Sequence, residues 1–313
     1  MKKIVPVLIL APALALGLTG CTTSSEASDA AITVENCGNT FSLDAAPERV
    51  VLQDASSVET LSQLGVLDRV VAKAGFFPEV YFDDETNAQL ADIPTLSDRL
   101  NTSGHLEISK EAVMAESPDL IIGYSNSVSA DTVSDVPVIN EPGFCGEVHD
   151  ASIEDVNDQI DLYATLFDES SRAESLKEDV ASRVAALDQT AGEGKTVAVV
   201  YPGIEGATMY AYGKDSMSNP VVTSVGLTNV FGDQQDRVFE ISAEQLVAAN
   251  PDVILLLHSG ESGAVDAVTT LPGADAITAV RENQILLLEL AFAEPPTPLA
   301  VDGAEKLEAF LQG

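Results

Sequence analysis

A segment of sixteen residues that begins at Glu107 recurs 133 positions later, from Glu240. Half of the aligned positions are identical, and half of the others exchange one apolar residue for another. Each copy has a serine suited to cap a helix (Ser109 or Ser242), a short amphipathic helix, a proline that ends it, and an apolar strand. A chain that contains the same helix–strand unit twice is predicted to fold into two structurally equivalent lobes rather than one large domain.

Short apolar runs alternate with helical periodicity on both sides of the repeat. The run at 49–52 precedes a helix with Val58, Leu61 and Leu64 on its apolar face, which ends at Gly65. The other predicted strands are 70–74, 119–124 and 136–140 in the first half, and 195–201, 209–212, 252–258 and 284–289 in the second. Because these runs are apolar throughout, we expect strands covered on both faces, as in the parallel sheets of α/β proteins.

Residues 152–191 contain no proline and carry apolar residues at steps of three and four. This spacing predicts helix, which the glycines at 192 and 194 would end before the next strand. We therefore expect an α/β protein with an N-terminal lobe over 32–169, a single interlobe helix over 170–191 and a C-terminal lobe over 192–313.

The first residues indicate export. Lys2 and Lys3 precede the apolar run 4–18, which is too short for a membrane span and is typical of a signal peptide. The run closes with Leu-Thr-Gly-Cys at 18–21, which resembles the lipobox of bacterial lipoproteins. We expect a signal peptide over 1–20, lipid on Cys21, a flexible tether over 21–31 and anchoring to the outer face of the cell membrane. An ordinary secretory signal with an incidental cysteine is the alternative.

The charge balance limits the partners. With 15 Lys+Arg against 50 Asp+Glu, the formal net charge is −35, so nucleic acid and anionic membrane surfaces are unfavourable partners. Contact with the membrane is expected through the N-terminal lipid only, and we expect a monomer.

Two cysteines remain once Cys21 is set aside. Cys37 and Cys145 form an even pair in an exported chain, which predicts a disulfide. Two buried thiols are the alternative, and neither cysteine has the spacing of a metal site.

Several motifs together resemble one protein family. They are the segments 47–51, 57–61 with Leu64-Gly65, both Glu-to-Pro-Asp segments, Tyr212-Gly213, and 225–230. In order and spacing they are similar to class III periplasmic binding proteins, the receptors of ABC importers for iron siderophores and cobalamin. The resemblance implies two Rossmann-like lobes bridged by one long helix, a metal chelate bound between the lobes, and no cofactor, because the metal arrives within the chelate.

The resemblance also implies a role for two glutamates. In the family, one glutamate on each lobe docks against arginines of the membrane permease, and Glu111 and Glu244 match those positions. Both stand in the first turn of a repeat helix, where the helix dipole alone favours an acid. Glu59 also lies in a family-like motif, but we interpret it as a solvent-facing acid.

Candidate ligand contacts are the aromatic and cationic residues near the predicted strand ends, where the loops of two such lobes converge. They are Tyr81, Tyr124, Tyr201, Tyr212 and Phe292, with Phe76 and Phe77 in a further loop, and the cations Arg99 and Arg237. Core packing is the alternative for each aromatic, and a surface salt bridge for each arginine. Without a dense basic cluster, the chain is expected to prefer a neutral or cationic hydroxamate complex to a triply anionic catecholate, while cobalamin and haem remain open.

A secreted α/β enzyme is the competing class. The sequence has no Gly-x-Ser-x-Gly elbow, no phosphate-binding loop with lysine and no His-Glu-x-x-His motif. His105, His149 and His258 are too scattered to predict a metal site. We therefore expect a binding protein with no resident metal and no catalytic residues.

Overall fold

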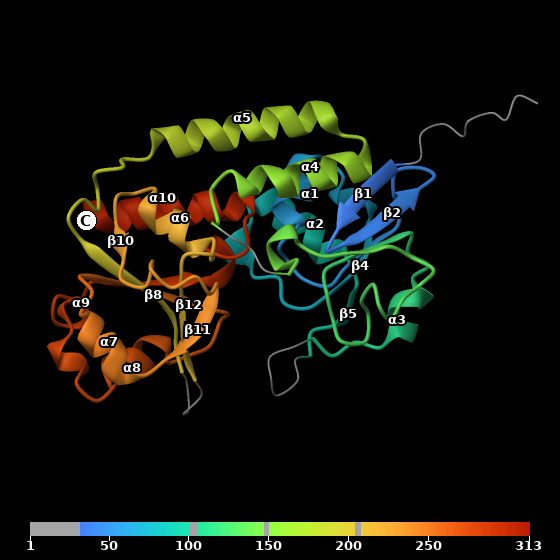
Figure 1. Ribbon diagram of the computed structural model, residues 1–313. Helices are drawn as coiled ribbons and strands as arrows, with labels where there is room; N and C mark the ends of the chain where they lie inside the picture. Colours follow the sequence, from blue (N-terminus) through green and yellow to red (C-terminus); the bar gives the residue numbers. More distant parts are fainter. Residues whose placement is uncertain (1–31, 100–105, 147–149, 204–207) are drawn as a thin grey trace, which may run out of the picture.

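The computed structural model describes residues 32–99, 106–146, 150–203 and 208–313. Two β-sheets lie side by side, each with its own helices, and a small β-hairpin stands at the edge of the first (Figure 1). The hairpin consists of β1 (Ile32–Asn36) and β2 (Asn39–Leu43), which pair antiparallel. The signal peptide, Cys21 and the tether lie outside the described residues.

The first sheet is entirely parallel, as predicted. Its strand order is β5-β4-β3-β6-β7. The strands are β3 (Val50–Leu52), β4 (Val70–Ala74), β5 (Thr95–Ser97), β6 (Leu120–Ile122) and β7 (Val138–Ile139). The predicted runs 119–124 and 136–140 were too long, since only their apolar centres pair.

The second sheet is mixed, which the sequence did not predict. Its order is β11-β9-β8-β12-β13, and β10 also pairs with β8. The strands are β8 (Thr196–Tyr201), β9 (Met209–Tyr212), β10 (Thr228–Asn229), β11 (Val238–Ile241), β12 (Val253–His258) and β13 (Ile285–Glu289). β9 runs antiparallel to β8 and β11 antiparallel to β9, whereas β8, β10, β12 and β13 are parallel.

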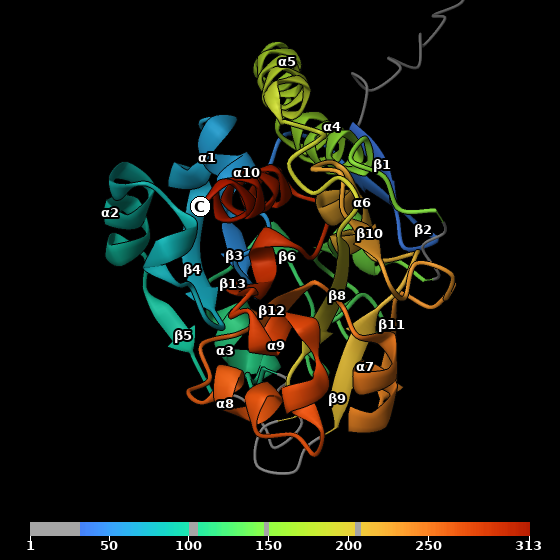
Figure 2. The same cartoon turned by 90° about the vertical axis from the view of Figure 1, so that its left-hand side faces the viewer.

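Helices cover both sheets. In both views α5 forms the outermost layer, with α4 and α10 beneath it, and α7, α8 and α9 lie at the opposite end of the second lobe (Figures 1 and 2). The α-helices are α1 (Val58–Gln63), α2 (Asp84–Asp92), α3 (Lys110–Ala115), α4 (Asp155–Phe167), α5 (Ser170–Ala186), α6 (Ser218–Thr223), α7 (Ala243–Ala249), α8 (Ala264–Thr269), α9 (Thr278–Arg281) and α10 (Pro298–Gln312).

The two repeats form equivalent units in separate sheets, as predicted. Ser109 caps α3 by accepting a hydrogen bond from the Ala112 backbone, and Ser242 caps α7 in the same way from Gln245. The following strands also correspond: β6 lies between β3 and β7, and β12 lies between β8 and β13. The internal repeat is therefore a repeat of structure as well as of sequence.

The predicted helical stretch 152–191 is two helices. α4 ends at Phe167, the following residue Asp168 has a left-handed backbone with φ 57°, and α5 begins at Ser170. α5 ends at Ala186, earlier than expected, because the Asp188 side chain accepts hydrogen bonds from the Thr190 backbone and hydroxyl and so stabilises a turn. The helix α10 also contacts both lobes, since it packs against α1 as well as α6.

The strands are buried on both faces. Val50 and Leu52 point into a core that continues through α4 and α10 into the second lobe, while Val51 faces a separate core beneath α3. In the second lobe, Val199 belongs to the shared core and Val200 to a core on the other face of the sheet. Burying one such aliphatic side chain stabilises the fold by about 1.5–3 kcal/mol. Because the shared core contains side chains of both lobes, this burial also holds the lobes together.

Within the described residues, no helix has both the length and the hydropathy that a membrane span requires.

Candidate functional site

Exposed aromatic side chains follow three strands of the first sheet. Phe76 follows β4, Tyr124 follows β6 and Phe144 follows β7, with 57%, 53% and 48% of their surface exposed. They are three of the six large apolar side chains exposed in the described part of the chain. Because parallel strands end at the same edge of a sheet, these exposed rings lie at the edge where ligands bind in α/β folds.

A small cavity of about 10 Å³ lies between the lobes, and we call it the interlobe cavity. Its lining combines residues from both lobes, including the predicted Arg237. From the first lobe they are Gly143, Ala151 and Asp155, and from the second Asp215, Met217, Arg237, Glu294 and Pro296.

Arg237 joins the lobes at this cavity. Its Nη1 donates to Glu294 Oε2 at 2.9 Å, and its guanidinium stacks on the Phe144 ring of the first lobe, 5.4 Å from the centroid. The Glu294 side chain is 3% exposed and that of Arg237 39%. A buried carboxylate thus neutralises a guanidinium that still reaches the cavity.

Tyr81 and Phe292, both predicted ligand contacts, meet across the lobe boundary. Their ring centroids are 5.3 Å apart in an edge-to-face arrangement, and Tyr81 Oη accepts a hydrogen bond from the Ala291 backbone. Phe292 is only 2% exposed and belongs to the shared core. In this conformation Phe292 packs against the Tyr81 ring and has almost no surface that a ligand could contact.

A second contact between the lobes lies beside the first. A Cβ built on Gly260, in the loop after β12, would lie 3.6 Å from Phe76 Cε1. That distance is an ordinary contact, so glycine is favoured here by its backbone φ of 100° rather than by lack of space.

Polar side chains gather where β8, β12 and β13 end. Tyr201 donates its phenol proton to Glu261, and burial together with this bond raises the pKa of Tyr201 to about 12. His258 Nδ1 accepts from the Gly260 backbone at 3.0 Å, and Nε2 lies 3.9 Å from Glu289 Oε1. His258 is therefore a hydrogen-bonded residue of the strand end.

The remaining predicted contacts differ in their surroundings. Tyr212 is buried beside Arg237 and Glu294, and burial raises its pKa. Tyr124 stays exposed and donates to Asn126. Arg99 is 78% exposed and pairs with Glu107 at 3.2 Å within the first lobe, so the surface salt bridge that we considered as its alternative is present.

A buried carboxyl group lies beneath the Phe144 loop. Glu141 Oε1 accepts from Tyr163 Oη at 2.7 Å and Oε2 from Gln159 Nε2 at 3.1 Å, both on α4. Burial, with the nearby carboxyl of Asp54, raises the pKa of Glu141 to about 8. Burial likewise raises the pKa of Asp54.

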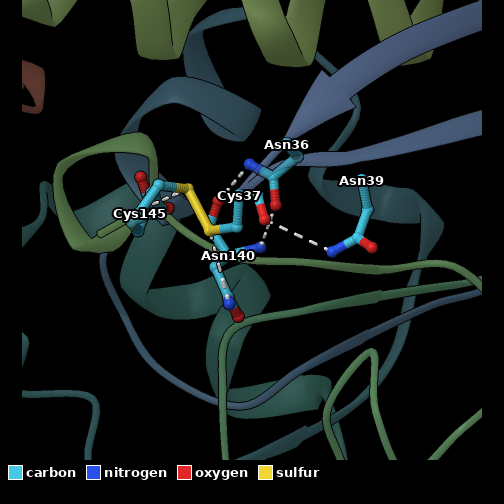
Figure 3. Close-up of a disulfide and its surroundings, with 6 residues drawn as sticks. Asn36, Cys37, Asn39, Asn140 and Cys145 are labelled. Atoms are coloured by element: carbon cyan, nitrogen blue, oxygen red, sulfur yellow. Dashed lines mark hydrogen bonds between the residues drawn. A yellow bond between two sulfur atoms is a disulfide. The ribbon is translucent and has the colours of Figure 1, made fainter. Parts of the chain in front are cut away.

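The predicted disulfide is confirmed: Cys37 and Cys145 are bonded, with their Cα atoms 4.6 Å apart (Figure 3). Cys37 lies in the turn of the β1–β2 hairpin, and Cys145 directly follows the short helix η3 (Pro142–Phe144). Beside the bond, the Asn36 side chain donates to the Asn140 carbonyl at 2.8 Å and accepts from the Asn140 N–H at 2.9 Å (Figure 3). These links anchor the segment that carries Phe144.

The two candidate docking glutamates are exposed. Glu111 lies in the first turn of α3, and Glu244 in the first turn of α7. Hydrogen bonds from its own backbone and from Ser242 lower the pKa of Glu244. In both views α3 and α7 lie on the side of the molecule away from α5 (Figures 1 and 2).

Other candidate sites are weaker. Among the described residues no group of three or more His, Cys, Asp or Glu side chains is arranged to hold a metal, and His105 and His149 lie outside them. A larger surface pocket of about 490 Å³ between α1 and α2 is lined by first-lobe residues alone, among them Asp68, Asp83 and Glu85. It is an acidic groove away from the lobe boundary.

Sequence reasoning missed Phe144 and Glu294 as site residues. Each lies a few residues after the end of a predicted strand, and this position is a signal that sequence reasoning could have used. Their contacts with Arg237, however, join three segments that are distant in the sequence. Only the relative placement of the lobes brings them together.

The chain matches the model of a protein family described as "Periplasmic binding protein" over residues 50–290. It is 43% identical to a crystal structure described as an ABC-type Fe3+-hydroxamate transport system from Saccharomonospora viridis DSM 43017, with a TM-score of 0.84, covering 90% of this chain and 99% of that one. The periplasmic haem-binding protein HutB of Vibrio cholerae shares the fold at 19% identity and a TM-score of 0.67, covering 85% and 99%. An uncharacterized ABC transporter substrate-binding lipoprotein, YvrC of Bacillus subtilis (strain 168), is 22% identical over 285 residues, 88% of this chain and 84% of that protein.

Proposed function

The chain belongs to the periplasmic binding protein family, and on that premise we propose that it is the extracytoplasmic receptor of an ABC importer for a ferric hydroxamate siderophore. It binds the chelate reversibly between its lobes and delivers it to the permease, with no bond made or broken. The 43% identical structure from S. viridis, described as an Fe3+-hydroxamate transport system, supports this substrate class.

The observation that carries the choice of ligand is the charge state of Arg237 at the lobe boundary. Glu294 forms an ion pair with Arg237 and neutralises its charge. A triply anionic catecholate chelate would lose its hydration without gaining a free cation from Arg237. A neutral or cationic hydroxamate chelate carries no such cost.

The exposed rings supply the rest of the binding surface. Phe76, Tyr124 and Phe144 offer apolar area to the organic backbone of a chelate, and the uncommitted N–H groups of Arg237 can donate to hydroxamate oxygens. Arg99 and Tyr201 stand as further candidate contacts.

A ligand panel tests the substrate class. Soluble protein without residues 1–21 is melted with ferrichrome, ferrioxamine B, their iron-free forms, ferric enterobactin, haemin and cyanocobalamin. A ligand at a hundredfold its dissociation constant stabilises the folded state by about 2.7 kcal/mol. We expect this from the ferric hydroxamates and not from the others. Stabilisation by haemin or cyanocobalamin alone would replace the hydroxamate with that ligand, and none at all would overturn the proposal.

Anchoring and docking complete the proposal. Lipid on Cys21 would hold the receptor at the outer face of the cell membrane, with the segment 22–31 as its tether. Glu111 and Glu244 would each meet an arginine of the permease, one through each lobe, because both are exposed acids at equivalent places in the repeat.

A further inference from the structure

Glu294 occupies an unusual position for an acid. It lies one residue beyond Ala293, the residue that ends the helical turn η6 (Leu290–Phe292) after the last strand, and its side chain is 3% exposed. Oε1 accepts from the hydroxyl of Ser216 and from the backbone N–H of Ser218 at 3.2 Å, while Oε2 accepts from Arg237. The carboxylate is thus held in place from two further segments of the same lobe.

This fixed carboxylate controls what Arg237 offers to the cavity. A pair of opposite charges 2.9 Å apart is nearly neutral at a distance, because the two opposite fields largely cancel. The Arg237 guanidinium keeps N–H donors beyond the Nη1 that binds Glu294 and is 39% exposed. It can bind oxygen atoms as a donor without acting as a net cation.

The other charged side chains that line the interlobe cavity are carboxylates. Asp155 and Asp215 face it together with Glu294, so Arg237 is the only basic residue among its described lining residues. The only guanidinium or ammonium group that an anionic ligand would meet among these lining residues is therefore one that Glu294 neutralises.

We propose that Glu294 is a specificity-determining residue: by neutralising Arg237 it makes the interlobe site reject anionic chelates and accept neutral or cationic ones. This inference rests on the proposed function, because it assigns the charge preference of the same site. The Glu294 side chain acts through Arg237 and is itself too buried to touch the ligand.

The isosteric variant Glu294→Gln tests the proposal. It removes the negative charge, leaves an oxygen for Ser218 and frees the Arg237 cation. We expect its affinity for ferric enterobactin to rise about tenfold or more, while its affinity for neutral ferrichrome changes by less than about threefold. The double variant E294Q/R237Q should lose the gain. The matched control is Glu240→Gln, which removes one exposed acid from β11 without touching Arg237.

Inorganic phosphate provides a readout that needs no chelate. We expect phosphate to raise the melting temperature of E294Q by more than it raises that of the native protein or of E294Q/R237Q. If E294Q does not fold, the double variant alone decides: a neutral pair predicts an unchanged preference for ferrichrome over ferric enterobactin. A preference that shifts further against the anion would show that Arg237 acts as a net cation and overturn the inference.

The outcomes separate this inference from the proposed function. Native protein that binds ferrichrome, with no gain for anions in E294Q or an equal gain in E240Q, would refute the role of Glu294 and leave the receptor function standing. A phosphate effect confined to E294Q in a protein that binds no ferric hydroxamate would support the role of Glu294 and refute the proposed ligand.

Discussion

Asp119 and Asp252, which correspond in the two repeats, each hold the start of the neighbouring central strand. The Asp119 carboxylate accepts from the backbone N–H groups of Glu48 and Arg49 at 2.8 and 2.9 Å, immediately before β3. Asp252 Oδ2 accepts from the backbone N–H and the hydroxyl of Thr196, both at 2.8 Å, at the start of β8. The Pro-Asp pair of the repeat thus aligns two adjacent strands in each lobe.

Replacing Asp252 with alanine should therefore destabilise the second lobe. Hydrogen bonds to a charged acceptor contribute about 1.5–3 kcal/mol, and we expect a loss of unfolding free energy in that range, measured by urea denaturation. Asp119→Ala should cost less, because that side chain is exposed. Asp233→Ala, an exposed acid in a loop, is the control. Equal stability of D252A and D233A would contradict this role.

Glu141 should make the protein less stable as the pH rises. Its pKa is about 8 in the folded state against 4.5 for an ordinary glutamate, so between these values the folded state binds more protons than the unfolded one. The contribution of Glu141 to the unfolding free energy is fully present below pH 4.5. It is lost as the pH rises towards 8, by at most about 1.4 kcal/mol per pH unit. Asp54, whose pKa is also raised, contributes in the same direction.

Glu141→Gln should flatten this dependence, because glutamine does not ionise. Unfolding free energies measured across the pH range test it, with the exposed Glu178→Gln on α5 as control. A slope in E141Q equal to that of the native protein would show that another group is responsible.

Much of the fold was predictable from local pattern. The strand at 70–74 and the equivalence of the two repeats follow from apolar runs and capping residues, which act within a few positions. The antiparallel pairing of β9 was not predictable, because a run of four residues carries no signal of strand direction. The early end of α5 depends on the Asp188 side chain, which sequence periodicity ignores.

The candidate site was less predictable. Arg237 was identified by its position before the second repeat, yet its neutralisation depends on Glu294, 57 residues away, and on Phe144 of the other lobe. Phe292 and Tyr212 follow the same rule of strand ends but are buried by α10 and by neighbouring side chains. Exposure at a strand end depends on how the lobes pack, and no local pattern encodes it.

Removing the disulfide should weaken both the fold and the site. The bond closes a loop with a sequence separation of 108, so its loss in the double variant C37S/C145S should lower the unfolding free energy by about 4–5 kcal/mol. Because the bond anchors η3, we also expect weaker ferrichrome binding through Phe144. Denaturation and titration of the variant beside the native protein measure both effects. Unchanged stability would contradict the first expectation, and unchanged affinity the second.

Reversing the charge of both docking glutamates should abolish transport without affecting binding. In E111K/E244K a lysine would face each permease arginine and repel it, while the ligand site is untouched. Iron uptake by cells and chelate affinity of the purified protein are compared at matched protein levels, and each single variant should be milder. Normal uptake by the double variant would leave only the helix-dipole role for these acids.

The most direct test of the receptor function is a calorimetric titration of the soluble protein with ferrichrome and, separately, with its iron-free form. We predict saturable binding of one ferric chelate per protein molecule, with the iron-free form bound much more weakly. Binding should also weaken when Arg237 and Glu294 are both replaced by glutamine, because the guanidinium donors are lost. Absence of saturable heat with ferrichrome and with ferrioxamine B would contradict the account.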